Sequence, residues 1–306
     1  MKKFTLLFLP LFILTLAVQA QIEISLRKTF IDSLKNSISI NSDYFVVKAH
    51  KSANPGSKDG DLHVAGYDNI IGMATVAEIM NAKKYKAALK VIHDNEGKNT
   101  PVPMHGAWRI WCEHPGSEGS FKQGKKSAMN NITTTNPDHA FEIHPVLSVG
   151  DNDLTPSLKK ITGFKYKDVT NAFNAYSNVR CKLKEKGDHI VIQTNGIGYN
   201  YVDFWIEIVD TSQFVVSDGR FVMCSVMDKN GEVLVSKMRM AFPLNSPAEK
   251  KVRTKQQGDK MHVVGIPRIS LALVAYRISH ADDFENILEW NLPMEMIIVS
   301  ALAGSN

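Results

Sequence analysis

Acidic and histidine side chains recur at positions two residues apart in the first half of the chain. The run Asp59-Gly60-Asp61-Leu62-His63 opens this region, and the run Glu142-Ile143-His144-Pro145-Val146 closes it. Both runs are typical of β-strands, on which side chains two positions apart point to the same face. Asp61 therefore shares a face with His63, and Glu142 shares a face with His144. We interpret the two pairs as parts of one polar site.

Further candidates lie on the strands expected between these two pairs. The full set of candidate ligand-binding residues is Asp61, His63, Glu78, Trp108, Arg109, His114, Glu142 and His144. Trp108 and Trp111 are expected to face opposite sides of a strand, one in the core and the other available to stack on a sugar ring or a base. Arg109 is expected to meet an anionic ligand.

Imidazole and carboxylate groups in this number suit a divalent metal such as zinc or manganese. The expected metal ligands are His63, His114, Glu142 and His144, and Glu142 or Glu78 would serve as a general base in an enzyme. The spacing matches no compact metal signature, because the chain has no H-E-x-x-H, C-x-x-C or EF-hand run. The alternative is a hydrogen-bonded network at the strand ends that binds nothing. The cost of burying several ionisable groups favours function for the set as a whole.

The same positions resemble a recurrent group of bacterial proteins whose function is uncharacterised. That group has a strand with D-G-D-x-H, a later strand ending in Glu, a G-x-W or G-x-L strand followed by His, and a final E-I-H-P-V. The matching residues here are Asp59 to His63, Glu78, Gly106 to Trp108 with His114, and Glu142 to Val146. The resemblance covers residues 58–147. It implies that these residues belong to one module and brings no activity with it.

The first twenty residues indicate export. Lys2 and Lys3 precede an apolar stretch, and Val18-Gln19-Ala20 supplies the small residues expected before cleavage at Gln21. We therefore expect residues 1–20 to be a signal peptide and the protein to be secreted or periplasmic. Cleavage lowers the net charge from +5 to +3, because the segment holds two lysines and no acids. So small a charge makes no strong case for nucleic acid, and no later stretch is apolar enough to span a membrane.

The remaining chain divides into two expected modules, residues 21–150 and residues 151–306. Runs rich in β-branched and aromatic residues dominate both, and each is expected to carry a helix, the first at about residues 82–96. Further expectations are a helix over residues 25–37, a β-hairpin turning at Asn195-Gly196, and a strand over residues 269–278.

A faint internal similarity links the two modules. The segment 104–110 resembles the segment 261–269, with a slip of two residues. The predicted fold class is therefore β-rich α+β, with two small OB-like or barrel-like β modules that each have a helix.

Three functions remain open at this point. The leading one is an extracytoplasmic protein that binds a small-molecule or polymer ligand at the His/Glu/Asp-lined site of the first module. The second is a metal-dependent hydrolase of phosphodiester or ester bonds. The third is a structural component of the cell envelope.

The export hypothesis makes a direct prediction about mass. Protein recovered from outside the cytoplasm should begin at Gln21, and intact-mass measurement or N-terminal sequencing checks this. Recovery of the full-length chain from the cytoplasm alone would contradict it.

Overall fold

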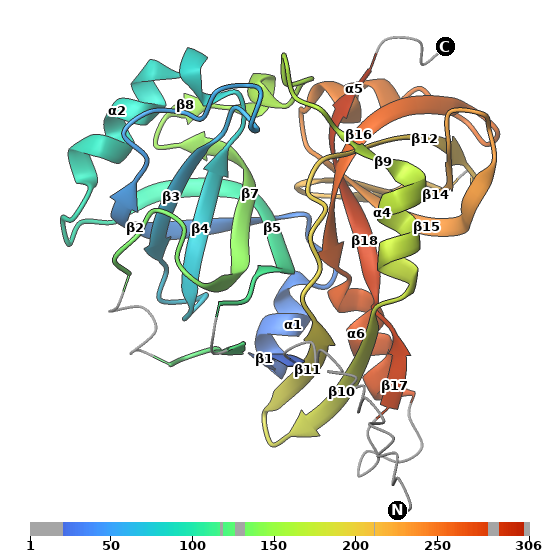
Figure 1. The fold of residues 1–306 in the computed structure, drawn as a ribbon, viewed down its shortest axis with the longest axis horizontal. Coiled ribbons are helices and arrows are strands. Elements are labelled where there is room, and N and C mark those ends of the chain that lie inside the picture. The colour runs from blue at the N-terminus through green and yellow to red at the C-terminus, as the bar shows by residue number, and fades with distance from the viewer. Residues whose placement is uncertain (1–20, 117–118, 126–131, 211, 281–287, 303–306) are drawn as a thin grey trace, which may run out of the picture.

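Two closed β-barrels lie side by side in the computed structural model, which describes residues 21–116, 119–125, 132–210, 212–280 and 288–302 (Figure 1). A third, open sheet lies below both barrels in this view. The predicted fold class, with two barrel-like modules and their helices, is confirmed. The expected signal peptide, residues 1–20, lies outside the described residues.

The first barrel closes because its third strand pairs with its fifth. Its strands are β2 (Ser39–Ala49), β3 (Leu62–Tyr67), β4 (Ala74–Ile79), β5 (Val102–His114) and β7 (His139–Val149). β3 pairs antiparallel with β2 and β4, β5 pairs antiparallel with β2 and β7, and β4 pairs parallel with β7. The short η1 (Ala82–Lys84) and the helix α2 (Lys86–Asn95) connect β4 to β5, where a helix was predicted. β8 (Asn152–Asp153) extends the sheet beside β7.

The second barrel repeats this arrangement strand for strand. Its strands are β12 (Val202–Ile208), β14 (Gly219–Met227), β15 (Val233–Pro243), β16 (Lys260–Ile269) and β18 (Met294–Ala301). β12 pairs antiparallel with β14 and β16, β14 with β15, β16 with β18, and β15 pairs parallel with β18. The helix α5 (Pro247–Val252) again connects the third strand to the fourth, and β9 (Lys167–Asp168) and β13 (Phe214–Val216) are short additions. Both barrels are therefore five-stranded and OB-like.

Strand register makes the two barrels equivalent residue by residue. Arg109 on β5 lies opposite Glu142 on β7, and Arg268 on β16 lies opposite Glu295 on β18. Both strand pairs also have an irregularity in register next to a glycine, Gly106 in one and Gly265 in the other. A side chain at Gly106 would lie 2.7 Å from the Pro145 carbonyl, so the close approach of the strands requires glycine there. The similarity of segments 104–110 and 261–269 therefore reflects equivalent strands.

The third sheet joins the two halves of the chain. In order, it contains β17 (Leu288–Asn291), β10 (Arg180–Lys186), β11 (His189–Asn195), β1 (Gln21–Arg27) and β6 (Ser120–Lys122). The remaining helical segments are α1 (Lys28–Leu34), η2 (Thr155–Ser157), α4 (Val169–Ser177) and α6 (Leu271–Ser279). Because β1 pairs with β11 along its whole length, the first strand of the expected first module packs with the second half.

Three local predictions were wrong. The helix predicted over residues 25–37 begins only at Lys28, because Ile22, Ile24 and Leu26 alternate as buried side chains of β1. Asn195-Gly196 does not close a hairpin, because β11 and β12 belong to different sheets. β11 instead forms a hairpin with the preceding strand, β10. Most of the strand predicted over residues 269–278 is the helix α6, whose buried residues are Leu271, Val274 and Ile278.

The barrels meet through the outer faces of β5, β7, β16 and β18. The apolar part of the contact contains Ala107, Leu147, Val264, Ile266, Ile297 and Val299. Arg109 donates from Nε to the carbonyl of Pro267 at 2.8 Å, and Arg268 donates from a terminal nitrogen to the carbonyl of Trp108 at 3.0 Å. Each arginine therefore binds the residue that precedes the other arginine, and the two contacts mirror each other.

Each arginine also pairs with a glutamate of its own barrel. Arg109 lies 2.5 Å from Glu142, and Arg268 Nε lies 2.7 Å from Glu295, which also binds Arg239. Arg109, Arg268, Glu142 and Glu295 are buried. Removing one partner of such a pair leaves an uncompensated buried charge.

The buried pairs predict a large loss of stability in one variant. Glu295→Ala should lower the free energy of unfolding by about 3–5 kcal/mol, because Arg268 and Arg239 lose their shared acid. Lys90→Ala, which breaks the exposed pair with Asp94, should change it by less than about 1 kcal/mol. Urea unfolding of both variants measures the difference, and equal, small losses would contradict this account.

Candidate functional site

The predicted acid and histidine pairs lie on the outer face of the first barrel, where the second half covers it. On β7, Phe141 and Ile143 point into the barrel core, so Glu142 and His144 point outward. On β3, His63 lies directly opposite Glu78 of β4. Asp61 and His144 are 0% exposed and Glu78 is 3% exposed. The strand alternation read from the sequence therefore brings these groups together in a buried layer.

His144 is at the centre of this group. Its Nδ1 atom lies 3.2 Å from Glu78 Oε2 and 3.3 Å from Glu142 Oε2. Its Nε2 atom lies 2.8 Å from the Tyr201 hydroxyl and 3.7 Å from Asp61 Oδ2. The Tyr201 hydroxyl also donates to Asp61 Oδ2 at 2.5 Å. The other oxygen of Asp61 is buried without a hydrogen-bond partner among the described residues.

Three of these residues are placed to hold a metal ion. Asp61, Glu78 and His144 each offer one donor atom, and the three atoms lie within 4.8 Å of one another. We name these three residues the Asp-Glu-His cluster. It shares only His144 with the metal ligands expected from the sequence, which were His63, His114, Glu142 and His144.

Glu142 has a different environment from the cluster. Its Oε1 atom lies 3.3 Å from His139 Nε2, and its Oε2 atom accepts from Arg109 and lies beside His144. Both oxygens are therefore already engaged by cationic or imidazole groups. Glu142 serves as the counter-ion of Arg109 and as a hydrogen-bond partner that orients His144.

The two other predicted histidine ligands lie farther from the centre. His63 Nε2 is 3.8 Å from Glu78 Oε1, and its Nδ1 atom is buried without a partner among the described residues. The ring of His114 stacks on that of His139, with centroids 5.1 Å apart. His63 therefore borders the cluster directly, whereas His114 stacks on His139, which in turn lies beside Glu142.

Trp108 and Arg109 belong to the packing between the barrels. The ring of Trp108 is fully buried under the guanidinium of Arg268, and its indole donates to the carbonyl of Ser37. Trp111 is also buried, against Tyr176. Contrary to expectation, neither tryptophan is an exposed stacking surface, because both faces of β5 are covered. Arg109 meets Glu142 and Glu113 of its own barrel, where an anionic ligand was expected.

Two residues of the site were missed in the sequence. Tyr201 comes from the segment before β12, 140 residues after Asp61, and nothing local to it signals a role. His139 opens the strand that carries Glu142 and His144, three residues before Glu142. Its nearness to that motif was an available signal.

The acids of the site differ in pKa because their surroundings differ. Burial raises the pKa of Glu78 to about 7, and burial together with Glu78 raises the pKa of Asp61 well above its ordinary value. Burial also acts on Glu142, but Arg109 and His139 outweigh it and hold its pKa well below the ordinary value. Glu142 is therefore ionised at neutral pH, whereas Glu78 and Asp61 resist ionisation unless a positive charge joins them.

The second barrel shows what the fold requires at these positions. Strand register places Gly219, Ala241 and Ile297 at the positions of Asp61, Glu78 and His144. The same barrel therefore forms without any of the three polar groups. The arginine and glutamate pair, in contrast, is present in both barrels. We infer that the arginine pair serves the architecture and that the Asp-Glu-His cluster is particular to the first barrel.

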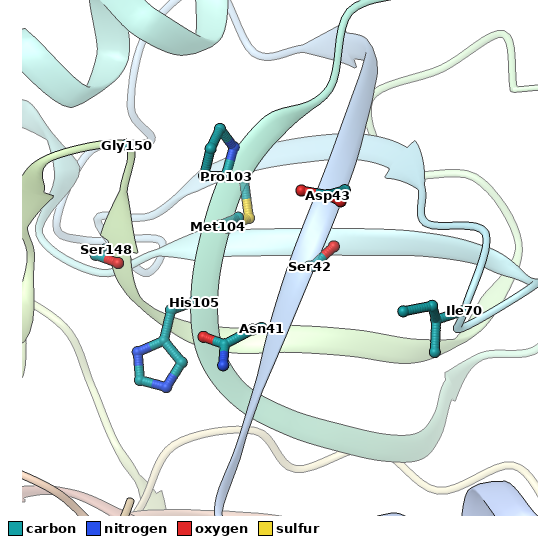
Figure 2. Close-up of a pocket in the computed structure, with 9 residues that line it drawn as sticks. All are labelled: Asn41, Ser42, Asp43, Ile70, Pro103, Met104, His105, Ser148 and Gly150. Carbon is teal, nitrogen blue, oxygen red and sulfur yellow. The ribbon is translucent and has the colours of Figure 1, made fainter.

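Two surface hollows lie on the first barrel. One, of about 350 Å³, is lined by residues of β2 and β5, including Asn41, Asp43 and His105 (Figure 2). None of its lining residues belongs to the cluster. The other, of about 390 Å³, is lined by Lys48, His50, Asn54 and Thr135, among others. His50 stacks on His63, with ring centroids 4.8 Å apart, and His63 in turn lies beside Glu78. The ring of His63 therefore lies between His50 and Glu78.

Comparison with known proteins adds no assignment. No family model matches the chain, and no curated protein matches it. Among the described residues, no helix has the length and apolar character needed to cross a membrane.

The raised pKa of Glu78 predicts how stability changes with pH. The folded protein holds this proton up to a pKa of about 7, against an ordinary 4.5, so the stabilisation is complete below pH 4.5 and is lost as the pH rises through 7. Glu78→Gln imitates the protonated form and should lack this loss. Between pH 5 and pH 8 the wild type should therefore lose up to roughly 3 kcal/mol relative to Glu78→Gln. Urea unfolding in the presence of a chelator measures this, and a constant difference across that range would contradict it.

Proposed function

We propose that this is an exported binding protein whose ligand is a metal ion held by the Asp-Glu-His cluster. The observation that carries the proposal is the convergence of three donor atoms within 4.8 Å in a buried layer, from β4, from β7 and from the residue that precedes β3. The export signal read in residues 1–20 supports a place outside the cytoplasm.

The chemistry of the cluster favours a cation. Asp61 and Glu78 lie in one buried site, with His144 between them, and two ionised carboxylates there would be costly without compensating charge. A divalent ion such as zinc or manganese balances two carboxylates. Oxygen and imidazole donors are ligands that both of these metals accept.

The surroundings of His144 resemble the outer shell of known metal sites. A histidine that binds a metal through one nitrogen commonly donates the other N–H to a carboxylate, which fixes the ring and its tautomer. Glu142 is that carboxylate here, 3.3 Å from His144 Nδ1 and kept ionised by Arg109. This assignment leaves His144 Nε2 as the nitrogen that faces the metal, so Glu78, whose Oε2 atom lies 3.2 Å from Nδ1, has to turn toward the Nε2 side when the metal binds.

Burial favours binding over hydrolysis. A metal-dependent hydrolase needs an open coordination position that a substrate can reach. Asp61 and His144 have no exposed surface, and Tyr201 covers their side of the cluster. An enclosed ion of this kind is held and released. The hollow lined by His50 offers an approach to it, because His50 stacks on His63, which lies beside Glu78.

Metal titration tests the proposal. Purified protein freed of metal by a chelator should bind one zinc or manganese ion per chain, with a rise in melting temperature. Asp61→Asn and Glu78→Gln should each weaken binding by about 10-fold to 100-fold or more, because each removes a charged donor. Asp43→Asn, in the hollow of Figure 2, is the matched control and should bind as the wild type does.

Two results would contradict the proposal. A wild-type protein that shows neither stoichiometric metal nor a metal-dependent shift in melting temperature does not have this function. Equal affinity in the wild type and in both cluster variants would place the metal elsewhere.

A further inference from the structure

We propose that Tyr201 is the fourth ligand of the cluster and that the ion it completes is a hard trivalent cation, ferric iron. This inference deepens the proposed function and rests on it. It makes the site a composite one, with three ligands from the first barrel and one from the chain that leads into the second.

The position of the Tyr201 oxygen carries the argument. It lies 2.5 Å from Asp61 Oδ2 and 2.8 Å from His144 Nε2, while those two atoms lie 3.7 Å apart. A cation about 2.1 Å from both of them, the usual distance for such donors, is restricted to a small circle between them. Every point on that circle is within about 3 Å of the Tyr201 oxygen, and some points are about 2 Å from it. A cation held by Asp61 and His144 therefore meets the phenol oxygen as well.

Hydrogen bonding around Tyr201 also favours coordination. The Tyr201 hydroxyl carries one proton and contacts two atoms, Asp61 Oδ2 and His144 Nε2. The other ring nitrogen of His144, Nδ1, faces Glu142 and Glu78. Asp61 Oδ1 is buried with no hydrogen-bond partner among the described residues. A cation would satisfy Asp61 Oδ1, which the Tyr201 proton leaves without a partner, while also binding Asp61 Oδ2 and His144 Nε2.

Charge balance then indicates the kind of ion. With Glu78 turned from His144 Nδ1 toward the ion, Asp61, Glu78 and a deprotonated Tyr201 supply three negative charges, and His144 is neutral as a ligand. A trivalent cation makes this buried set neutral, whereas a divalent cation leaves one negative charge unless Tyr201 keeps its proton. Carboxylate and phenolate oxygens are hard donors, which a small, highly charged cation prefers over soft ones.

Absorbance spectroscopy distinguishes the two ions. Residues 21–306, freed of metal, are titrated in one series with ferric nitrilotriacetate and in another with zinc. If Tyr201 is a ligand, the ferric protein is coloured by a phenolate-to-iron charge-transfer band. Tyr201→Phe removes the band and weakens ferric binding by about 100-fold, while zinc binding changes much less. Tyr276→Phe, at an exposed tyrosine, is the control and keeps the band.

Each outcome decides one claim. Ferric binding without the band, or a band that survives in Tyr201→Phe, overturns Tyr201 as a ligand and leaves the proposed function standing. Zinc binding without ferric binding overturns the choice of ion only. Binding of neither metal overturns this inference together with the proposed function. If Tyr201→Phe fails to fold, resonance Raman spectra of the ferric wild type report tyrosinate ligation directly, and their lack of tyrosinate modes would overturn the inference.

Discussion

Two buried arginines hold the rest of this structure in place. Arg109 and Arg268 each pair with a glutamate on the neighbouring strand and donate to a carbonyl of the opposite barrel. Because a buried charge is tolerated only when it is paired, these contacts fix how the barrels dock. Docking covers the outer face of the first barrel, and that cover buries the acids beside His144. The shifted pKa values and the enclosed donor set both follow from it.

The likeness of the two barrels separates architecture from function. At positions that the barrel needs, both copies have the same residue type. Gly106 and Gly265, at the irregular strand pairing of each barrel, are one example. The positions of Asp61, Glu78 and His144 hold glycine, alanine and isoleucine in the second copy, which still closes with the same strand order. Three ionisable groups in a buried layer are therefore an addition to the fold. Such additions are costly, which is why a ligand that compensates their charge is the simplest account of them.

Much of the fold was readable from the sequence because alternation of apolar residues is a local signal. It predicted the strands of both barrels apart from β18, and the shared faces of Asp61 with His63 and of Glu142 with His144. It failed where a local signal was ambiguous: Leu26 also fits the helical spacing of Phe30, Ile31 and Leu34, although it lies on β1, which pairs with β11. Asn195-Gly196 suits a hairpin equally well, but the chain crosses there from one sheet to another.

The site could be predicted only where its residues share a strand or neighbouring strands. Tyr201 bonds to Asp61, which lies 140 residues earlier in the chain, and Glu142 pairs with Arg109 on the neighbouring strand. Spacing along the sequence reveals neither contact. The central claim is that a metal ion occupies the space between Asp61, Glu78 and His144. The most direct measurement is anomalous X-ray scattering from crystals of the protein loaded with metal. The account predicts one strong peak within bonding distance of all three side chains. A metal-loaded crystal whose peaks all lie elsewhere, with these side chains bonded only to one another, would contradict it.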